Sequence, residues 1–381
     1  MIHYFDNSAT TKPCPEAVRA VTEALTEDWG NPSSLHSLGV NAHRRLQAAR
    51  LSVAKALGAE PDRVFFTSGG TEADNWALFS AARKLGRRGK HIITTRIEHH
   101  AVLHPLRELE AQGFELTYLA PEADGTVSLE ALRAALRPDT ILVSVMLVNN
   151  EVGSVLPVQS MAKLTHRLAP EALFHTDAVQ GFLKLPFRAS SLEADLISVS
   201  SHKVHGPKGA GALWVRKGLS LPPFLQGGGQ ESGLRSGTEA VPNLLGFGAA
   251  CEAALPTLRE DLARENALKE RIRAGLAALD GVVLNGAQTA PHIVSFAVPG
   301  LRSQGLINCL QDRGVYVSAG SACAKGHRSH VLEAMGLPPA VIDGSVRASL
   351  SRFTTEEDAD ALIEAVREAA AQLTGNLPVS G

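Results

Sequence analysis

The sequence has little of several features that would assign it to a specialised class of protein. It contains four cysteines in 381 residues, none of them in a C-x-x-C pair, which argues against a disulfide framework and a structural zinc site. The longest strongly apolar run, ILVSVMLV, has eight residues and is too short to cross a bilayer. Any cysteine with a function is therefore expected to act as a thiol.

An excess of charge of one sign is also missing. The 37 basic and 39 acidic side chains leave a formal net charge of -2, and no basic block stands out. We therefore expect no membrane partner and no direct contact with nucleic acid. The first residues, MIHYFDNSATTKP, lack the basic and apolar regions of a signal peptide, which favours a cytoplasmic location.

The chain does have a regular alternation of strand-like and helical stretches between about residues 60 and 216. Seven apolar or β-branched runs predict strands: RVFFTS, HIITT, ELTYLA, ILVSVMLV, ALFHTDA, DLISVSS and GALWVR. Most are too continuously apolar to have a wet face, and helical spacing lies between them. We therefore expect an α/β domain with a mostly parallel seven-stranded sheet between helices.

The pattern changes after the glycine-rich segment LPPFLQGGGQESGLRSGTEAVPN. A long helical stretch from about Leu244 to Leu279 precedes three strand-like runs separated by helices, HIVSFAV, VYVSAG and VRASLS. This predicts a smaller α+β domain, and a chain of 381 residues is long enough for two domains. We expect a large domain over residues 11–250 and a small domain over residues 251–381, which includes residues 1–10.

Polar residues follow several predicted strands, at the edge of the sheet where α/β proteins bind ligands. In FFTSGGTEADN a strand leads directly into a helix at Gly70 and Thr71, so free backbone N–H groups and a hydroxyl converge at the positive helix end. This pattern is typical of a phosphate site, and a tight turn capped by Thr71 is the simpler alternative. The motif G-x-x-x-x-G-K-[ST] is absent, which argues against a nucleoside triphosphate.

Three further strand ends carry candidate ligands. His99 in IEHHAV either begins a helix or stacks on an aromatic ligand. Asn150 in VNNEVG either caps a turn or contacts a ligand. Asp177 in FHTDAVQG follows a buried strand, and Gln180 lies three residues on. A buried carboxylate needs a partner, for which a protonated ring nitrogen is suitable.

The segment SVSSHKVHGPKG places Lys203 directly after three strand-end donors, Ser200, Ser201 and His202. Lysines are usually solvated, but a partly buried lysine has a lowered pKa and becomes a nucleophile toward carbonyl carbon. Lys208 is a rival that lies beyond the strand end. Pyridoxal phosphate requires a Schiff-base lysine and an acidic partner for its ring nitrogen. The sequence offers both, together with a phosphate site and a side chain that can stack on the ring.

The motifs as a set resemble a known family. They are DNSATT, TSGGTEADN, EHHAV, VNNEVG, HTDAVQ, SSHKVHGPKG, RSGTEAVPN, GSAC and VRASLSRFTTEED, in this order over nearly the whole chain. They are similar to those of the cysteine desulfurases of the NifS/IscS type, which are class V aminotransferase-like, fold type I pyridoxal phosphate enzymes. The resemblance implies a cytoplasmic homodimer that converts L-cysteine to L-alanine and passes the sulfur to an iron-sulfur scaffold or another acceptor.

The resemblance also implies a role for each matching residue. Lys203 would bind the cofactor aldehyde, and His99 would stack on the pyridine ring. Cys323 of GSAC would attack the sulfur of the cofactor-bound substrate and carry it as a persulfide. Asn150 and Arg347 would hold the substrate carboxylate. The other expected cofactor contacts are Gly70, Thr71, Asp177, Gln180, Ser200, Ser201, His202 and Thr238, the last reaching the phosphate of the neighbouring subunit.

The sequence departs from the IscS pattern in the segment after Cys323, which is shorter and more basic here. Its Lys325, His327 and Arg328 favour a thiolate, and the departure leaves the sulfur acceptor open. A selenocysteine lyase or cysteine sulfinate desulfinase on the same fold is one alternative, and dependence on Cys323 separates it. A non-enzymatic sulfur carrier or scaffold is another. No metal is expected, because H-E-x-x-H or similar spacing is absent.

Overall fold

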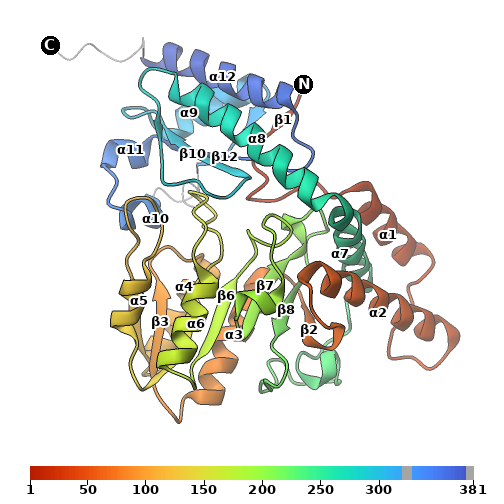
Figure 1. Cartoon of the computed structure of the whole chain (residues 1–381). Helices are drawn as coiled ribbons and strands as arrows, with labels where there is room; N and C mark the ends of the chain where they lie inside the picture. The colour runs from red at the N-terminus through yellow and green to blue at the C-terminus, as the bar shows by residue number, and fades with distance from the viewer. Residues whose placement is uncertain (320–327, 375–381) are drawn as a thin grey trace.

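The computed structural model describes residues 1–319 and 328–374 of the chain. Its main element is a seven-stranded sheet in the order β2-β8-β7-β6-β5-β3-β4 (Figure 1). In chain order the strands are β2 (Val64–Thr67), β3 (His91–Thr95), β4 (Glu115–Leu119), β5 (Thr140–Ser144), β6 (Leu173–Asp177), β7 (Leu196–Ser200) and β8 (Gly211–Val215). All seven strands that the sequence predicts therefore lie in one sheet.

The direction of the strands places their carboxyl ends together. The neighbours from β7 through β6, β5 and β3 to β4 pair in parallel, whereas β8 is antiparallel to both β7 and β2. Six strands thus point the same way and β8 runs against them. The prediction of a mostly parallel sheet is confirmed.

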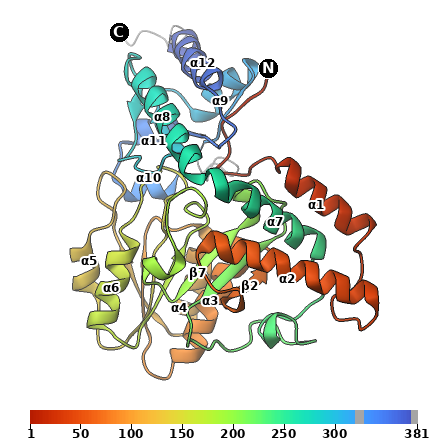
Figure 2. The same ribbon diagram turned by 45° about the vertical axis from the view of Figure 1, so that its right-hand side comes forward.

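Helices cover both faces of this sheet, which explains why its strands are continuously apolar. In β2, Val64 and Phe66 point into one core and Phe65 into another, and residues of β7 and β8 divide between the same two cores. The first core is covered by α2 (Ser37–Leu57), α5 (Leu129–Ala135), α6 (Val158–Leu168) and α7 (Val241–Ala254), and the opposite face by α3 (Gly70–Leu85) and α4 (His100–Ala111). The helix α1 (Pro15–Thr26) packs beside α2 against α7 (Figure 2).

A second group of elements lies above the carboxyl ends of the sheet (Figure 1). Its three antiparallel strands are β9 (Val283–Leu284), β10 (Ile293–Ala297) and β12 (Ser345–Ser349), and its helices are α8 (Leu258–Ala277), α9 (Ser303–Asp312), α10 (His330–Ala334), α11 (Pro339–Asp343) and α12 (Glu356–Thr374). The N-terminal β1 (His3–Tyr4) pairs in parallel with β11 (Val315–Tyr316), so the start of the chain joins this group. Phe5 packs into this second core.

Two predicted elements differ from the structure. The long helical stretch is interrupted by a 3-10 turn at Leu255–Thr257, where Pro256 cannot donate a backbone hydrogen bond and ends α7 before α8 begins. The run ILVSVMLV forms a strand only as far as Ser144; the chain then leaves the sheet and Val148 pairs with Val155. In the described part of the chain, none of the helices combines the length and apolar character that a membrane crossing requires.

Candidate active site

A cavity of about 390 Å³ lies at the carboxyl ends of β2, β3, β5, β6 and β7. Because parallel strands end at one edge of the sheet, the polar residues after them converge there. Ten predicted site residues line this cavity: Gly70, Thr71, His99, Asn150, Asp177, Gln180, Ser200, His202, Lys203 and Arg347. Residues that are up to 277 positions apart in the sequence, from Gly70 to Arg347, therefore meet in one site.

Two predicted residues are not brought to this cavity, and a third is not described by the structure. Ser201 is fully buried beneath it and its backbone N–H donates to Ala210. Thr238 is exposed on a separate loop. Cys323 lies outside the described residues.

Lys203 ends the 3-10 turn that follows β7, and its side chain points beneath the N-terminal segment. The Nζ atom donates to the carbonyl oxygens of Ser8, at 2.5 Å, and Ala9, at 2.8 Å. Burial lowers the pKa of the Lys203 amine to about 7, and the positive charges of Lys184 and Arg347 act in the same direction. An amine with this pKa is partly neutral near pH 7 and can act as a nucleophile or as an acid and base.

The rival lysine has a different environment. Lys208 is exposed, and it lines the outer rim where Gly69 and His202 also lie. The structure therefore places Lys203, and not Lys208, in the inner cavity.

His99 has the first of the two roles that the sequence leaves open, and stacking on a ligand stays a prediction. It is the residue before α4, and its Nδ1 accepts the backbone N–H of Ala101 at 3.1 Å, so it does begin a helix. It also lines the cavity. Burial and the nearby charge of Lys203 lower the pKa of His99 to about 4. The ring is therefore neutral at pH 7 and presents an uncharged face to a ligand.

The two asparagines of this turn, Asn149 and Asn150, have different environments. The Oδ1 of Asn149 accepts the backbone N–H groups of Glu151 and Val152, at 2.9 and 3.0 Å, and so caps the turn. Asn150 lines the cavity instead. Its carbonyl oxygen accepts from Arg347 Nη1 at 2.8 Å. Asn149 thus caps the turn, and a ligand contact by Asn150 stays a prediction.

Arg347, in the middle of β12, is held by two acceptors before any ligand binds. Besides the carbonyl of Asn150, the Asp6 carboxylate accepts from its Nη2 at 2.9 Å. Only 4% of the Arg347 residue is exposed, and its Nε has no acceptor within the described ranges. A buried guanidinium with a free N–H is well suited to a carboxylate ligand.

Asp177 ends β6 at the floor of the cavity. Its Oδ1 accepts the backbone N–H of Val179 at 2.8 Å, which leaves the carboxyl group facing the cavity. Burial raises the pKa of Asp177 to about 7, and the neighbouring carboxyl group of Asp74 raises it further in the same direction. Such a carboxyl group gains most from a cationic partner, because a nearby positive charge would restore its ordinary ionisation.

A buried polar network, which the sequence analysis missed, lies beside Asp177. Asp74 of α3 also lines the cavity, and burial raises its pKa to about 7. His175 Nε2 lies 3.5 Å from Asp74 Oδ1 and 3.0 Å from the Ser198 hydroxyl, and its Nδ1 lies 2.8 Å from that of Ser144. Asp74 lies on a helix one turn after Thr71, so a search restricted to strand ends could not find it.

A concave site at the start of α3 is formed by backbone atoms around Gly70. A Cβ added to Gly70 would lie 2.7 Å from Val179 Cγ2, and one added to Gly211 would lie 2.7 Å from Gly69 Cα. Glycine at these positions lets β8 and residue 179 approach the helix start closely. The backbone N–H groups at the helix start can then receive an anion.

Residues that line the cavity carry unpaired buried polar atoms. The Ser200 hydroxyl and Gln180 Oε1 have no hydrogen-bond partner among the described residues, whereas Gln180 Nε2 donates to the Ser8 carbonyl at 2.8 Å. Leaving such atoms unpaired costs about 1–3 kcal/mol each, so a ligand that pairs with them would stabilise the site. The residues present therefore fit a phosphate joined to a planar, protonated ring, as pyridoxal phosphate requires.

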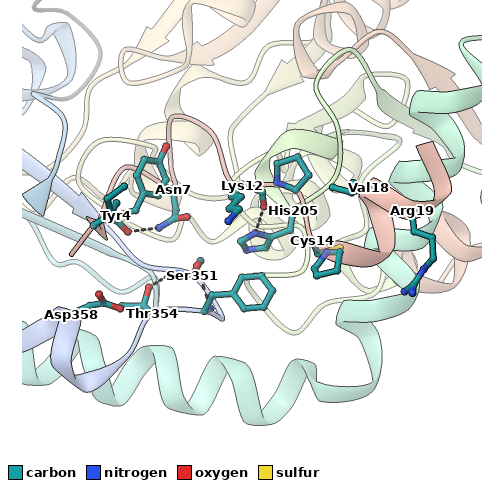
Figure 3. Close-up of a pocket in the computed structure, with 14 residues that line it drawn as sticks. Tyr4, Asn7, Lys12, Cys14, Val18, Arg19, His205, Ser351, Thr354 and Asp358 are labelled. Atoms are coloured by element: carbon teal, nitrogen blue, oxygen red, sulfur yellow. Dashed lines mark hydrogen bonds between the residues drawn. The ribbon is translucent and has the colours of Figure 1, made fainter. Parts of the chain in front are cut away.

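A second and larger cavity, of about 660 Å³, lies on the other side of the N-terminal segment (Figure 3). The predicted site residues within the described ranges do not line it. Its polar groups are paired with each other: Lys12 O lies 2.9 Å from His205 Nδ1, and Asn7 Nδ2 donates to Tyr4 O at 3.1 Å. This surface, called the N-terminal groove below, thus lacks the convergent unpaired groups of the smaller cavity.

The chain is similar over nearly its whole length to proteins of known family. The family model described as Aminotransferase class-V matches residues 3–362. A protein named cysteine desulfurase IscS, from Methanosarcina thermophila, is 42% identical over 381 residues, which cover 99% of this chain and 94% of that protein. The solved structure of a NifS-like protein has a TM-score of 0.92 at 38% identity and covers 98% of this chain and 100% of its own.

A further solved structure holds a small molecule. It is titled SspA in complex with cysteine, and it has a TM-score of 0.79 at 33% identity, covering 92% of this chain and 99% of its own.

Proposed function

Because the chain belongs to the aminotransferase class-V family and is a pyridoxal phosphate-dependent cysteine desulfurase, we propose that Lys203 holds the cofactor and that Cys323 receives the sulfur of L-cysteine. The observation that carries the proposal is the position of the half-buried Lys203 amine, which lines the cavity and has a pKa of about 7. The carbon skeleton of the substrate leaves as L-alanine.

The remaining residues of the cavity suit the parts of the cofactor. Gly70, Thr71 and Ser200 would hold the phosphate, with the outward-facing His202 beside them. Asp177 would hold the ring nitrogen, and His99 would cover the ring face. When bound, the cofactor supplies an electron sink for the substrate α-carbon.

Lys203 is also suited to move a proton at that carbon. The carbonyl groups of Ser8 and Ala9 orient its amine, and its lowered pKa allows both protonation states near neutral pH. Arg347 and Asn150 would bind the carboxylate of L-cysteine, which fixes the position of the side chain that reacts. The structure titled SspA in complex with cysteine supports an amino acid ligand of this kind.

Cys323 is favoured as the sulfur acceptor because the other cysteines have unsuitable environments. Burial raises the pKa of the Cys14 thiol and, more strongly, that of the Cys251 thiol. A thiolate is the nucleophilic form, so both residues are poor nucleophiles. Cys309 lies on α9 and does not line the cavity. Cys323 itself lies outside the described residues, with Lys325 and His327 close in sequence to favour its thiolate.

Mass spectrometry tests the assignment of Cys323. After incubation with L-cysteine we expect one additional sulfur on the Cys323 peptide and one L-alanine per sulfur. Cys323→Ser should abolish both, because serine cannot form a persulfide, whereas Cys309→Ser should behave like the wild type. Undiminished alanine release by Cys323→Ser would instead indicate selenocysteine lyase or cysteine sulfinate desulfinase chemistry.

We further propose that the enzyme is a homodimer in which Thr238 reaches the phosphate of the neighbouring subunit. The loop that carries Thr238 is rigidly held: Arg50 donates two hydrogen bonds to Glu231, at 2.7 and 2.8 Å, and Arg235 two to Glu72, at 2.7 and 3.0 Å. Thr238 is exposed at its tip and is not among the residues of its own cavity. Large apolar side chains between α1 and α2 are also exposed, Trp29 by 68% and Leu35 by 97%, which supports a covered surface.

A mixed dimer tests this arrangement. Thr238→Ala should weaken cofactor binding about 10- to 100-fold, the scale of a lost hydrogen bond to a charged group. A dimer of one Lys203→Ala and one Thr238→Ala subunit should regain one site of wild-type affinity, because that site takes Lys203 from one subunit and Thr238 from the other. If Thr238 serves its own subunit, the mixed dimer regains nothing.

We propose a cytoplasmic location, because a thiol such as Cys323 persists in a reducing compartment. An iron-sulfur scaffold is the proposed sulfur acceptor, and another acceptor thiol is the alternative. Sulfur-transfer assays with each acceptor would separate the two.

We also propose a small domain over residues 251–381 with 1–10. The second core, which joins Phe5 to α8, α9 and α12, supports it, although Ile293 and Val331 pack on the larger core.

A further inference from the structure

Behind Lys203 lies a second buried lysine that the proposed reaction does not use. Lys184 follows the turn after Gln180 and is 7% exposed, and its Nζ has no hydrogen-bond acceptor in the part of the chain that the structure describes. A lysine is seldom buried to this degree without a direct partner. Its position therefore calls for a physical explanation.

Lys184 and Lys203 share a small cavity with an acidic residue. The cavity, of about 30 Å³, is also lined by Glu265, which comes from α8 and is 6% exposed. The Glu265 Oε2 has no hydrogen-bond donor among the described side chains or backbone groups. A cavity of this size holds about one water molecule, so the two charged groups can interact across it without direct contact.

We propose that Lys184 is a positioning residue that keeps a positive charge behind Lys203, balanced by Glu265 across the small cavity, and so favours the unprotonated amine that the reaction needs. The proposal rests on the assignment of Lys203 as the residue that holds the cofactor. It also gives α8, which lies outside the seven-stranded sheet, a part in setting the chemistry of the site.

The electrostatic environment agrees in sign with this role. Burial lowers the pKa of Lys184 to about 8, and the Glu265 carboxylate opposes that change. The positive charge of Lys184 disfavours a second charge on Lys203. The other charged and titratable groups that face the two lysines and Glu265 are Arg347, Asp177, Asp6, Asp261, Arg264, Arg352, His99, His202, His205 and His292.

A pH titration of the visible absorption of the cofactor-loaded enzyme tests the proposal. Lys184→Met removes the positive charge. The pH midpoint at which the Lys203 nitrogen, joined to the cofactor, gains its proton should therefore rise by about one pH unit. Lys184→Arg retains the charge and should titrate close to the wild type. A purely structural role for Lys184 would change the melting temperature without moving this midpoint.

Two further variants keep the outcome decisive. Lys184→Met leaves Glu265 uncompensated, so the double variant Lys184→Met with Glu265→Gln is used if the single variant does not fold. Its upward shift should be smaller, because the two lost charges act on Lys203 in opposite directions. A wild-type midpoint in either folded variant overturns the role of Lys184. If Lys203→Ala retains the visible band, the assignment of Lys203 fails as well; if it loses the band, only the role of Lys184 is in question.

Discussion

Two cavities lie on opposite sides of the N-terminal segment, and the smaller one is the candidate active site. The N-terminal groove measures about 660 Å³ against about 390 Å³ for the site. In the groove, polar groups such as Lys12 O and His205 Nδ1 satisfy one another, as Figure 3 shows. In the site, the Ser200 hydroxyl, Gln180 Oε1 and Arg347 Nε are buried with no partner among the described residues.

The difference shows that volume is a poor guide to a binding site, and that unsatisfied buried groups are a better one. Folding tolerates unpaired polar atoms only at a cost, and in the site a ligand can restore the missing interactions. The shifted pKa values follow the same division, because Lys203 and Asp177 both titrate near 7 in the site. Matched substitutions in the two cavities should therefore have different consequences.

The largest difference is expected between two lysines. Lys203→Ala removes the group that holds the cofactor and moves the proton, and should reduce alanine formation at least about 10³-fold and abolish the visible absorption band. Lys12→Ala in the N-terminal groove should leave both unchanged. Steady-state kinetics and an absorption spectrum measure the two effects, and equal losses in the two variants would remove the distinction between the cavities.

An intermediate difference is expected between two arginines. Arg347→Lys keeps the charge but loses the planar fork, so the KM for L-cysteine should rise about 10- to 100-fold with a smaller change in kcat. Arg19→Lys, in the groove, serves as the control and should leave the KM as it is. A fall in kcat with an unchanged KM would mean that Arg347 does not bind the substrate carboxylate.

The smallest difference is expected between two hydroxyl groups. Loss of one should lower cofactor affinity, and loss of the other should lower the free energy of unfolding. Ser200→Ala removes an unpaired group, so it should weaken cofactor affinity about 10-fold but barely change the free energy of unfolding of the cofactor-free protein. Thr354→Val removes the acceptor of the Ser351 N–H, at 2.9 Å, and should cost about 1 kcal/mol of stability with cofactor affinity intact. Denaturant titration and cofactor binding together detect this crossover; parallel changes in both variants contradict it.

The sequence was most informative where local pattern and topology coincide. Continuous apolar runs predict the seven strands, and the rule that ligands bind at strand ends then selects Gly70, His99, Asp177 and Lys203 without any knowledge of packing. The turn at Asn149 and Asn150 shows the limit, because the spacing alone cannot say which of the two caps the turn. That choice depends on the contact of Asn149 with the Ile97 carbonyl, across the sheet edge.

Contacts between distant segments could not be predicted in the same way. The carbonyl groups of Ser8 and Ala9 meet Lys203 only because β1 pairs with β11 and carries the following residues across the sheet. Asp74 was missed because it lies inside a helix. The helices α1 and α2 were also left unassigned, although Pro15 at the start of the first and a left-handed Gly58 after the second are ordinary boundary signals.

The path of the N-terminal segment has a practical consequence for handling the protein. Asp6 holds Arg347, the carbonyl groups of Ser8 and Ala9 hold Lys203, and Thr11 donates to the carbonyl of His202. Trimming the chain through Thr11 would remove supports of the substrate arginine and the cofactor lysine in a single cut. Affinity tags and fusion partners should therefore be joined ahead of an intact N-terminal segment or at the opposite end of the chain.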